Sequence, residues 1–87
     1  MVSKIVIVQN QVGLHSKPAT CFIQKANEYK STIWVERSEK KANAKSLLGI
    51  LSLGVIKGTE IKIIADGPDE KEALDGVCTL VSNDFFE

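Results

Sequence analysis

The stretch of sequence that decides the fold runs from residue 4 to residue 23 and reads KIVIVQNQVGLHSKPATCFI. Its first part, Lys4–Val8, is rich in β-branched residues and predicts a strand, which a polar loop over 9–11 ends. Pro18 then opens an amphipathic pattern that continues to about Tyr29 and predicts a helix, because proline is favoured in a first helical turn. The apolar positions with helical spacing in this pattern are Ala19, Phe22, Ile23 and Ala26.

The rest of the chain continues to alternate between strand-like and helix-like segments. Strands are predicted at 32–36, 41–43 and 60–65, a short apolar helix at 46–53, and a last helix after the break at 67–69. The order is therefore strand, helix, strand, strand, helix, strand, helix. Since helices on one face of an antiparallel sheet form a two-layer domain, the pattern predicts an α+β fold.

Length and charge narrow the class of protein. The chain has 87 residues, which predicts one domain spanning residues 1–87. Its 11 basic and 11 acidic side chains balance, which argues against non-specific binding to nucleic acid or to an anionic membrane. No apolar run approaches a membrane span, and the start of the chain has no secretory apolar region. We therefore expect no membrane insertion and a cytoplasmic location.

The two cysteines, Cys21 and Cys78, lie far apart and belong to no Cys-x-x-Cys or Cys/His cluster. We expect both thiols to be reduced, with no bound metal and no cofactor. Cys78 falls on the apolar stripe of the last predicted helix, so it is predicted to lie in the core.

His15 is the only histidine, and it lies at the junction between the polar loop and the helix that Pro18 opens. The first N–H groups of a helix lack intrahelical partners, and the positive pole of the helix dipole lies there, so this end accepts an anion. A neutral imidazole also has a free ring nitrogen that can act as a nucleophile. A phosphoryl group on His15 would lie among backbone donors and beside Lys17. The plainer alternative is that His15 only caps the helix or lies on the surface.

Two blocks of the sequence resemble one family. Residues 13–19, GLHSKPA, resemble the active-site signature of HPr, the histidine-containing phosphocarrier protein of the bacterial sugar phosphotransferase system. Residues 43–54, NAKSLLGILSLG, resemble the regulatory serine segment of HPr proteins from Gram-positive bacteria. The resemblance covers essentially the whole chain. It implies an open-faced two-layer sandwich, in which a four-stranded antiparallel sheet carries three helices on one face in the order βαββαβα.

The resemblance implies a phosphoryl carrier rather than an autonomous enzyme. His15 would accept the phosphoryl group from enzyme I, which phosphoenolpyruvate charges, and pass it to enzyme IIA, the sugar-specific permease component. Ser16, Lys17 and Pro18, at the helix N-terminus, are the predicted phosphate-binding residues. Lys17 stands where the family usually has arginine, and lysine keeps the charge but lacks the planar fork that holds phosphate at two points.

Ser46 is the second candidate site. It precedes an apolar run and is predicted to be a helix N-cap, a role that would by itself account for a serine there. The resemblance implies instead that an HPr kinase/phosphorylase modifies Ser46 and that the modified form binds a catabolite-control transcription factor. By the same resemblance, Leu47, Leu48 and Leu51 belong to a partner-binding surface, whereas Ile50 is predicted to lie in the core.

Three functions remain open from the sequence. The first is the phosphoryl shuttle, and the second is a regulatory HPr-like module that acts through phospho-Ser46 in carbon catabolite repression with weak or no phosphotransfer. The third is a small α+β scaffold that binds an anionic ligand at the helix terminus. Lys17 fits the second function, whereas the presence of His15 favours the first. A monomer is expected, because a shuttle must expose one small surface to several partners.

Overall fold

The sheet has four strands, all antiparallel to their neighbours. The computed structural model describes residues 1–83 and gives the strands as β1 (Val2–Ile7), β2 (Thr32–Arg37), β3 (Lys40–Asn43) and β4 (Glu60–Asp66). Their order in the sheet is β1-β4-β2-β3. The first and third strands of the chain are therefore the two edges, and the strands with the most buried side chains lie in the middle.

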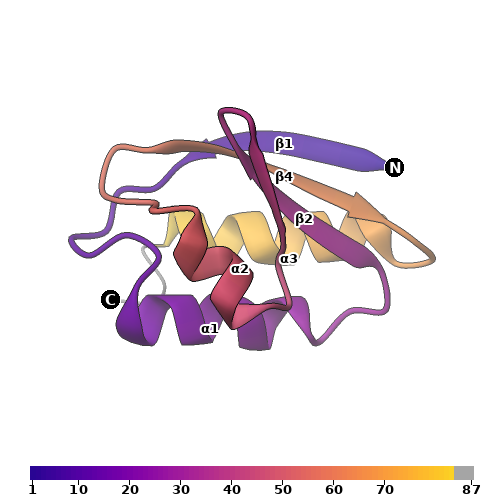
Figure 1. Cartoon of the computed structure of the whole chain (residues 1–87). Helices are drawn as coiled ribbons and strands as arrows, with labels where there is room; N and C mark the ends of the chain where they lie inside the picture. The colour runs from indigo at the N-terminus through magenta and orange to yellow at the C-terminus, as the bar shows by residue number, and fades with distance from the viewer. Residues whose placement is uncertain (84–87) are drawn as a thin grey trace.

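Three helices lie together on one side of this sheet, as Figure 1 shows. They are α1 (Ser16–Ala26), α2 (Leu47–Ser52) and α3 (Glu70–Ser82). Among residues 1–83, no helix lies on the other side of the sheet, so the sandwich is open-faced (Figure 1). The predicted α+β architecture and its order βαββαβα are confirmed.

Alternation along the central strands sends apolar side chains to the helix side of the sheet. Ile33 and Val35 of β2 have no exposed surface, whereas Trp34 between them is half-buried and belongs to the other face. Ile63 of β4 pairs opposite Val35 and is equally buried. The core lies between this layer and the helices, where Phe22 of α1 is also fully buried.

Several elements differ from the sequence-based prediction by one residue at an end, and α1 and β1 differ by more; α1 begins at Ser16, before Pro18. The apolar pattern predicts a helix to about Tyr29, but α1 ends at Ala26. The Nδ2 group of Asn27 donates to the carbonyl oxygen of Ile23 at 3.0 Å, and the Nζ group of Lys45 donates to the carbonyl oxygen of Tyr29 at 2.8 Å. The second contact comes from a segment distant in sequence, so periodicity could not predict it.

The first strand starts earlier than its β-branched run predicts. β1 begins at Val2 instead of Lys4, because Val2 pairs with Ala65 in the sheet. Val8, predicted as its last residue, lies just after the strand but remains fixed, since its N–H donates to the carbonyl oxygen of Thr59 at 2.9 Å.

The start of α3 is tied to the loop after α1. The carboxylate of Asp69 accepts hydrogen bonds from the backbone N–H groups of Lys30 and Ser31, each at 2.9 Å, and from the Ser31 hydroxyl. The pKa of the Asp69 carboxyl is lowered because the Ser31 hydroxyl, and then the Lys30 N–H, donate to its charged form. This cluster joins two segments that are far apart in the sequence.

Two further expectations concern the cysteines and the membrane. Cys21 is half-buried, Cys78 is buried, and both are free thiols, so the predicted core position of Cys78 is confirmed. Burial raises the pKa of the Cys78 thiol. None of the helices within residues 1–83 combines the length and the apolarity needed to cross a membrane.

Candidate functional site

His15 is the N-cap residue of α1, and its backbone is extended, with φ −133° and ψ 162°. The residue is exposed, and its side chain makes no capping hydrogen bond. Its carbonyl oxygen accepts from the N–H of Ala19 at 3.4 Å, which closes the first turn of the helix. The predicted junction between the loop and the helix is therefore present, and the imidazole does not serve as a side-chain cap of the helix.

The residues after His15 form the first turn of α1. Ser16 and Lys17 are exposed, and within residues 1–83 their backbone N–H groups have no hydrogen-bond partner. Lys17 makes no ion pair with any residue of that range. Pro18 is buried and has no N–H to donate, so it contributes to the shape of the turn and not to a hydrogen bond. Two free amides and one free ammonium thus lie within two residues of the imidazole.

The backbone of Ser16 is a feature that the sequence does not predict. Its φ is +52°, in the left-handed region that costs a non-glycine residue about 1–2 kcal/mol. Such conformations persist where the surrounding structure fixes them, and they cluster at functional sites. No residue-type signal reveals this strain, because serine is common in ordinary turns.

The loop before His15 is pressed against the segment that follows α2. Gly13 has φ +66°, and a Cβ atom built on it would lie 2.3 Å from the carbonyl oxygen of Val55. The N–H of Leu14 donates to that same oxygen at 3.1 Å, and the Leu14 side chain has no exposed surface. Only glycine fits this contact, since any side chain would meet backbone. The contact places His15 on a fixed support.

Ser46 is the N-cap of α2, as the apolar run after it predicts. Its Oγ atom accepts a hydrogen bond from the N–H of Gly49 at 3.1 Å, and its carbonyl oxygen accepts from the N–H of Ile50 at 2.9 Å. The residue is half-buried. The hydroxyl is therefore engaged in the structure of the helix start.

The leucines of α2 divide between core and surface. Leu47 is 48% exposed and Leu48 is 80% exposed, whereas Leu51 is half-buried and packs against the core. Ile50 has no exposed surface, so its predicted core position is confirmed. Leu47 and Leu48 present apolar surface that folding does not use, as a docking surface requires.

Two exposed apolar side chains near His15 were not predicted from the sequence. Val12 is 48% exposed and Ile56 is 58% exposed. They flank the contact between the two loops, because a Cβ atom on Gly13 would lie 2.6 Å from the Cα atom of Ile56. Neither belongs to a periodic pattern. Val12 lies in the same loop as His15, and the packing of one loop on the other brings Ile56 beside it.

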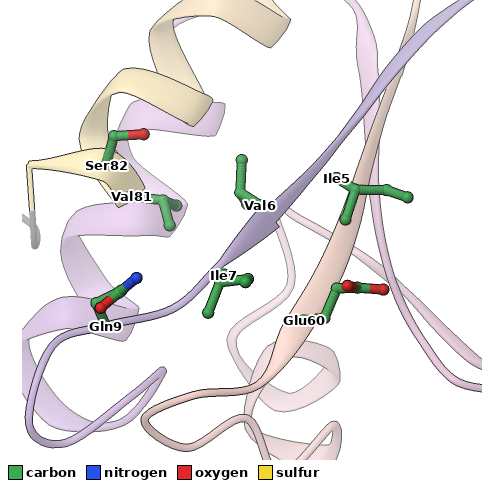
Figure 2. A pocket seen from close by; sticks show the side chains of 7 residues that line it. All are labelled: Ile5, Val6, Ile7, Gln9, Glu60, Val81 and Ser82. Carbon is green, nitrogen blue, oxygen red and sulfur yellow. The ribbon is translucent and has the colours of Figure 1, made fainter.

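Elsewhere, a hollow opens between β1 and the end of α3. Figure 2 shows the side chains that line it, which are Ile5, Val6, Ile7, Gln9, Glu60, Val81 and Ser82. None of the predicted site residues is among them, so the candidate site is an exposed helix start and not this hollow. Within residues 1–83, no group of three His, Cys, Asp or Glu side chains could hold a metal ion.

The family of the chain follows from a comparison with known proteins. A family model described as the PTS HPr component phosphorylation site matches residues 2–83. The fold and the two helix starts thus define a protein of the HPr class, and the chain belongs to the HPr family.

Individual relatives include both carriers and HPr-like proteins. The HPr-like protein Crh of Bacillus subtilis is 43% identical over 84 residues, which cover 97% of this chain and 99% of that protein. The phosphocarrier protein HPr of Neisseria meningitidis is 34% identical over 87 residues, which cover 100% of this chain and 98% of that protein. The family resemblance read from the two sequence blocks is confirmed.

Solved structures agree with the fold and raise the question of assembly. The structure of HPr-C-His from Thermoanaerobacter tengcongensis is 44% identical, with a TM-score of 0.98 over 100% of this chain and 98% of that one. A structure described as an HPr dimer from the same organism is 45% identical, with a TM-score of 0.81 over 94% of each chain. Crh of Bacillus subtilis is described as a domain-swapped dimer; it is 41% identical, with a TM-score of 0.78 over 100% of both chains.

These dimeric relatives conflict with the expectation that this chain is a monomer. The expectation rested on the need to present one small surface to several partners. A dimer meets the same need whenever its interface lies elsewhere on the protomer, so the argument does not select a monomer.

Proposed function

We propose that the protein is a phosphoryl carrier of the phosphoenolpyruvate-dependent sugar phosphotransferase system. His15 accepts the phosphoryl group from enzyme I and passes it to enzyme IIA, in the cytoplasm where these partners act. The observation that carries this proposal is the free helix start: an exposed imidazole next to the unpaired N–H groups of Ser16 and Lys17. The family match supports a phosphocarrier role at the level of the class.

The chemistry needs positioning more than it needs catalytic groups. A ring nitrogen of His15 attacks the phosphorus atom, a new P–N bond forms, and the P–N bond to the donor histidine breaks. Because one P–N bond replaces another, the step is close to balanced in energy and runs in either direction. The charge on the transferred group is met by the Lys17 ammonium and by the backbone donors of the first turn. The protein is then a substrate of its two partner enzymes and not an autonomous catalyst.

We extend the proposal to Ser46 as a regulatory site, with an HPr kinase/phosphorylase as the modifying partner and a catabolite-control transcription factor as the reader of the modified form. A phosphate on the hydroxyl adds a dianion beside Leu47 and Leu48, which are exposed. Docking surfaces that use Leu47, Leu48 and Leu51 then acquire a charge at their rim. Modification is thereby expected to change the choice of partner.

The decisive test is phosphorylation of the full chain by enzyme I with labelled phosphoenolpyruvate. We expect acid-labile, base-stable label on the wild-type chain, because a P–N bond hydrolyses in acid. His15→Ala is the matched variant and should take none, while Ser46→Ala should take label normally. A wild-type chain that remains unlabelled while an ordinary HPr is charged would remove the carrier function.

A second candidate function is a regulatory HPr-like module in which phospho-Ser46 carries the activity and phosphotransfer is weak. The observations that favour it are the lysine at position 17 and the similarity to an HPr-like protein, Crh. The experiment with enzyme I separates the two functions, since a regulatory module should take little or no phosphate on His15 from enzyme I.

A further inference from the structure

The loop that joins β1 to His15 is irregular, yet both of its ends are fixed. At one end, the N–H of Gly58 donates a hydrogen bond to the carbonyl oxygen of Val8 at 2.6 Å. At the other end, the N–H of Leu14 donates to the carbonyl oxygen of Val55 at 3.1 Å. Between these ends the polar side chains of Gln9 and Gln11 are exposed. Asn10 is different, because only 3% of it is exposed. A buried asparagine in a polar loop needs a physical reason.

Asn10 closes the turn before His15 from both sides. Its side-chain Nδ2 group donates to the carbonyl oxygen of Gly13 at 2.9 Å, and its backbone carbonyl oxygen accepts from the N–H of Gly13 at 3.3 Å. The peptide group between Gly13 and Leu14 is thus held by the Asn10 side chain on one side and by Val55 on the other. That peptide lies immediately before the residue that precedes His15.

The side-chain oxygen of Asn10 makes an unfavourable contribution to the free energy of folding. This Oδ1 atom is buried and accepts no hydrogen bond from any residue in 1–83. Burying an unpaired acceptor is unfavourable, so a small apolar residue would suit a role of filling space better. The fold therefore depends on the Nδ2 hydrogen-bond donor of Asn10 and not on the volume of the side chain.

His15 depends on this backbone because its own side chain is not fastened by a cap. The imidazole makes no capping hydrogen bond, so the position of the ring depends on the extended backbone of His15 and on the loop before it. An error in that direction moves the attacking nitrogen relative to the amides of Ser16 and Lys17. Misplacing a reacting atom by about 1 Å can cost about a hundredfold in rate.

We propose that Asn10 is a positioning residue for phosphoryl transfer: it fixes the Gly13–Leu14 peptide and thereby the place of the His15 ring. The inference rests on the proposed function and deepens it by adding a residue outside the two sequence motifs. Asn10 is buried and acts through the backbone that carries His15.

The test measures the rate of charging by enzyme I as the concentration of the carrier is varied. For Asn10→Ala we expect kcat to fall about tenfold while KM stays within about twofold, because docking surfaces are unchanged and the reacting geometry is not. Asn10→Asp keeps the shape of the side chain but loses its hydrogen-bond donor, so kcat should fall at least as far in this variant. Gln11→Ala, one residue away and exposed, is the matched control and should keep the wild-type values.

An independent readout does not depend on transfer. All four proteins are compared by NMR under conditions where circular dichroism shows them folded. The amide shifts of Leu14 and the ring shifts of His15 should move in the two Asn10 variants and not in Gln11→Ala. A purely structural role would lower the unfolding temperature and leave kcat and the ring shifts of the folded protein unchanged, which would overturn the inference.

The outcomes separate this inference from the proposed function. Label on the wild-type chain together with an unchanged kcat in Asn10→Ala would overturn the inference alone. A loss confined to KM, or an equal loss in Gln11→Ala, would do the same. A wild-type chain that takes no label would overturn the proposed function and the inference together.

Discussion

The N-termini of α1 and α2 have the same type of backbone geometry at the N-cap but differ in whether the N-cap side chain accepts a hydrogen bond. Each has an extended N-cap residue, His15 in one and Ser46 in the other. The Ser46 hydroxyl accepts from the N–H of Gly49 at 3.1 Å, whereas the His15 ring makes no capping bond and the N–H groups of Ser16 and Lys17 have no partner in the described part of the chain. A helix start closed by its cap is stable, and one left open can receive an anion. Within residues 1–83, His15 is therefore positioned by backbone hydrogen bonds alone, whereas Ser46 is also fixed by a hydrogen bond of its side chain.

The largest effect should come from Gly13→Ala, which attacks the backbone support of His15. The new Cβ atom would lie 2.3 Å from the Val55 carbonyl oxygen, at a φ of +66°. Clash and strain together predict a loss of about 3 kcal/mol in the free energy of unfolding. Gly58→Ala is the matched control, because its φ is +89° and, apart from its chain neighbours, no atom of residues 1–83 lies within 4 Å of the new Cβ. Strain alone should cost about 1 kcal/mol there, and urea denaturation measures both.

Ser46→Asp tests whether the α2 start belongs to a docking surface. We expect its affinity for enzyme I to fall about tenfold, which corresponds to about 1.4 kcal/mol, because a charge at an apolar rim must be desolvated on docking. Ser3→Asp adds the same charge at an exposed position of β1 and should leave affinity unchanged. Calorimetric titration that gives one affinity for all three proteins would detach Ser46 from the surface.

The two caps can be compared directly by removing each side chain. Ser46→Ala should lower the free energy of unfolding by about 1 kcal/mol, since the Gly49 N–H loses its acceptor. His15→Ala should change it by less than about 0.5 kcal/mol, because the ring makes no capping bond and is exposed. Thermal and urea denaturation measure both values. An equal cost for the two substitutions would contradict the distinction between a closed and an open start.

The smallest effect is expected from Lys17→Arg. A guanidinium holds phosphate at two points, so transfer from phospho-His15 to enzyme IIA should become about twofold to fivefold faster in single turnover. Lys17→Gln provides the comparison in the other direction, because it removes the charge and should slow transfer. Identical rates for lysine and arginine, together with slower transfer in Lys17→Gln, would show that charge alone matters at this position.

Much of the fold could be predicted from local patterns. The strand Lys4–Val8, the proline-led helix and the alternation of Ile33 and Val35 each depend on a few adjacent residues, and the structure has all three within a few residues of their predicted ends. The end of α1 could not be predicted in this way, because Lys45, from the segment before α2, holds the carbonyl of Tyr29. The family was also readable, since both motifs are continuous stretches.

The chain by itself determined the order of its elements, the two helix starts and the residues His15 and Ser46 that occupy them, because periodicity and capping act over a few residues. The closed start of α2 was also predicted, since Ser46 caps an amide only three residues away. The tertiary structure decided that the α1 start is open, that Ser16 has a left-handed backbone, and that Gly13 packs against Val55. It also decided that Asn10 is buried while Gln11 is not. The Gly13 contact depends on how one loop packs against another, and Gly13 and Val55 are about 40 positions apart, beyond the reach of the short patterns that predict helices and strands.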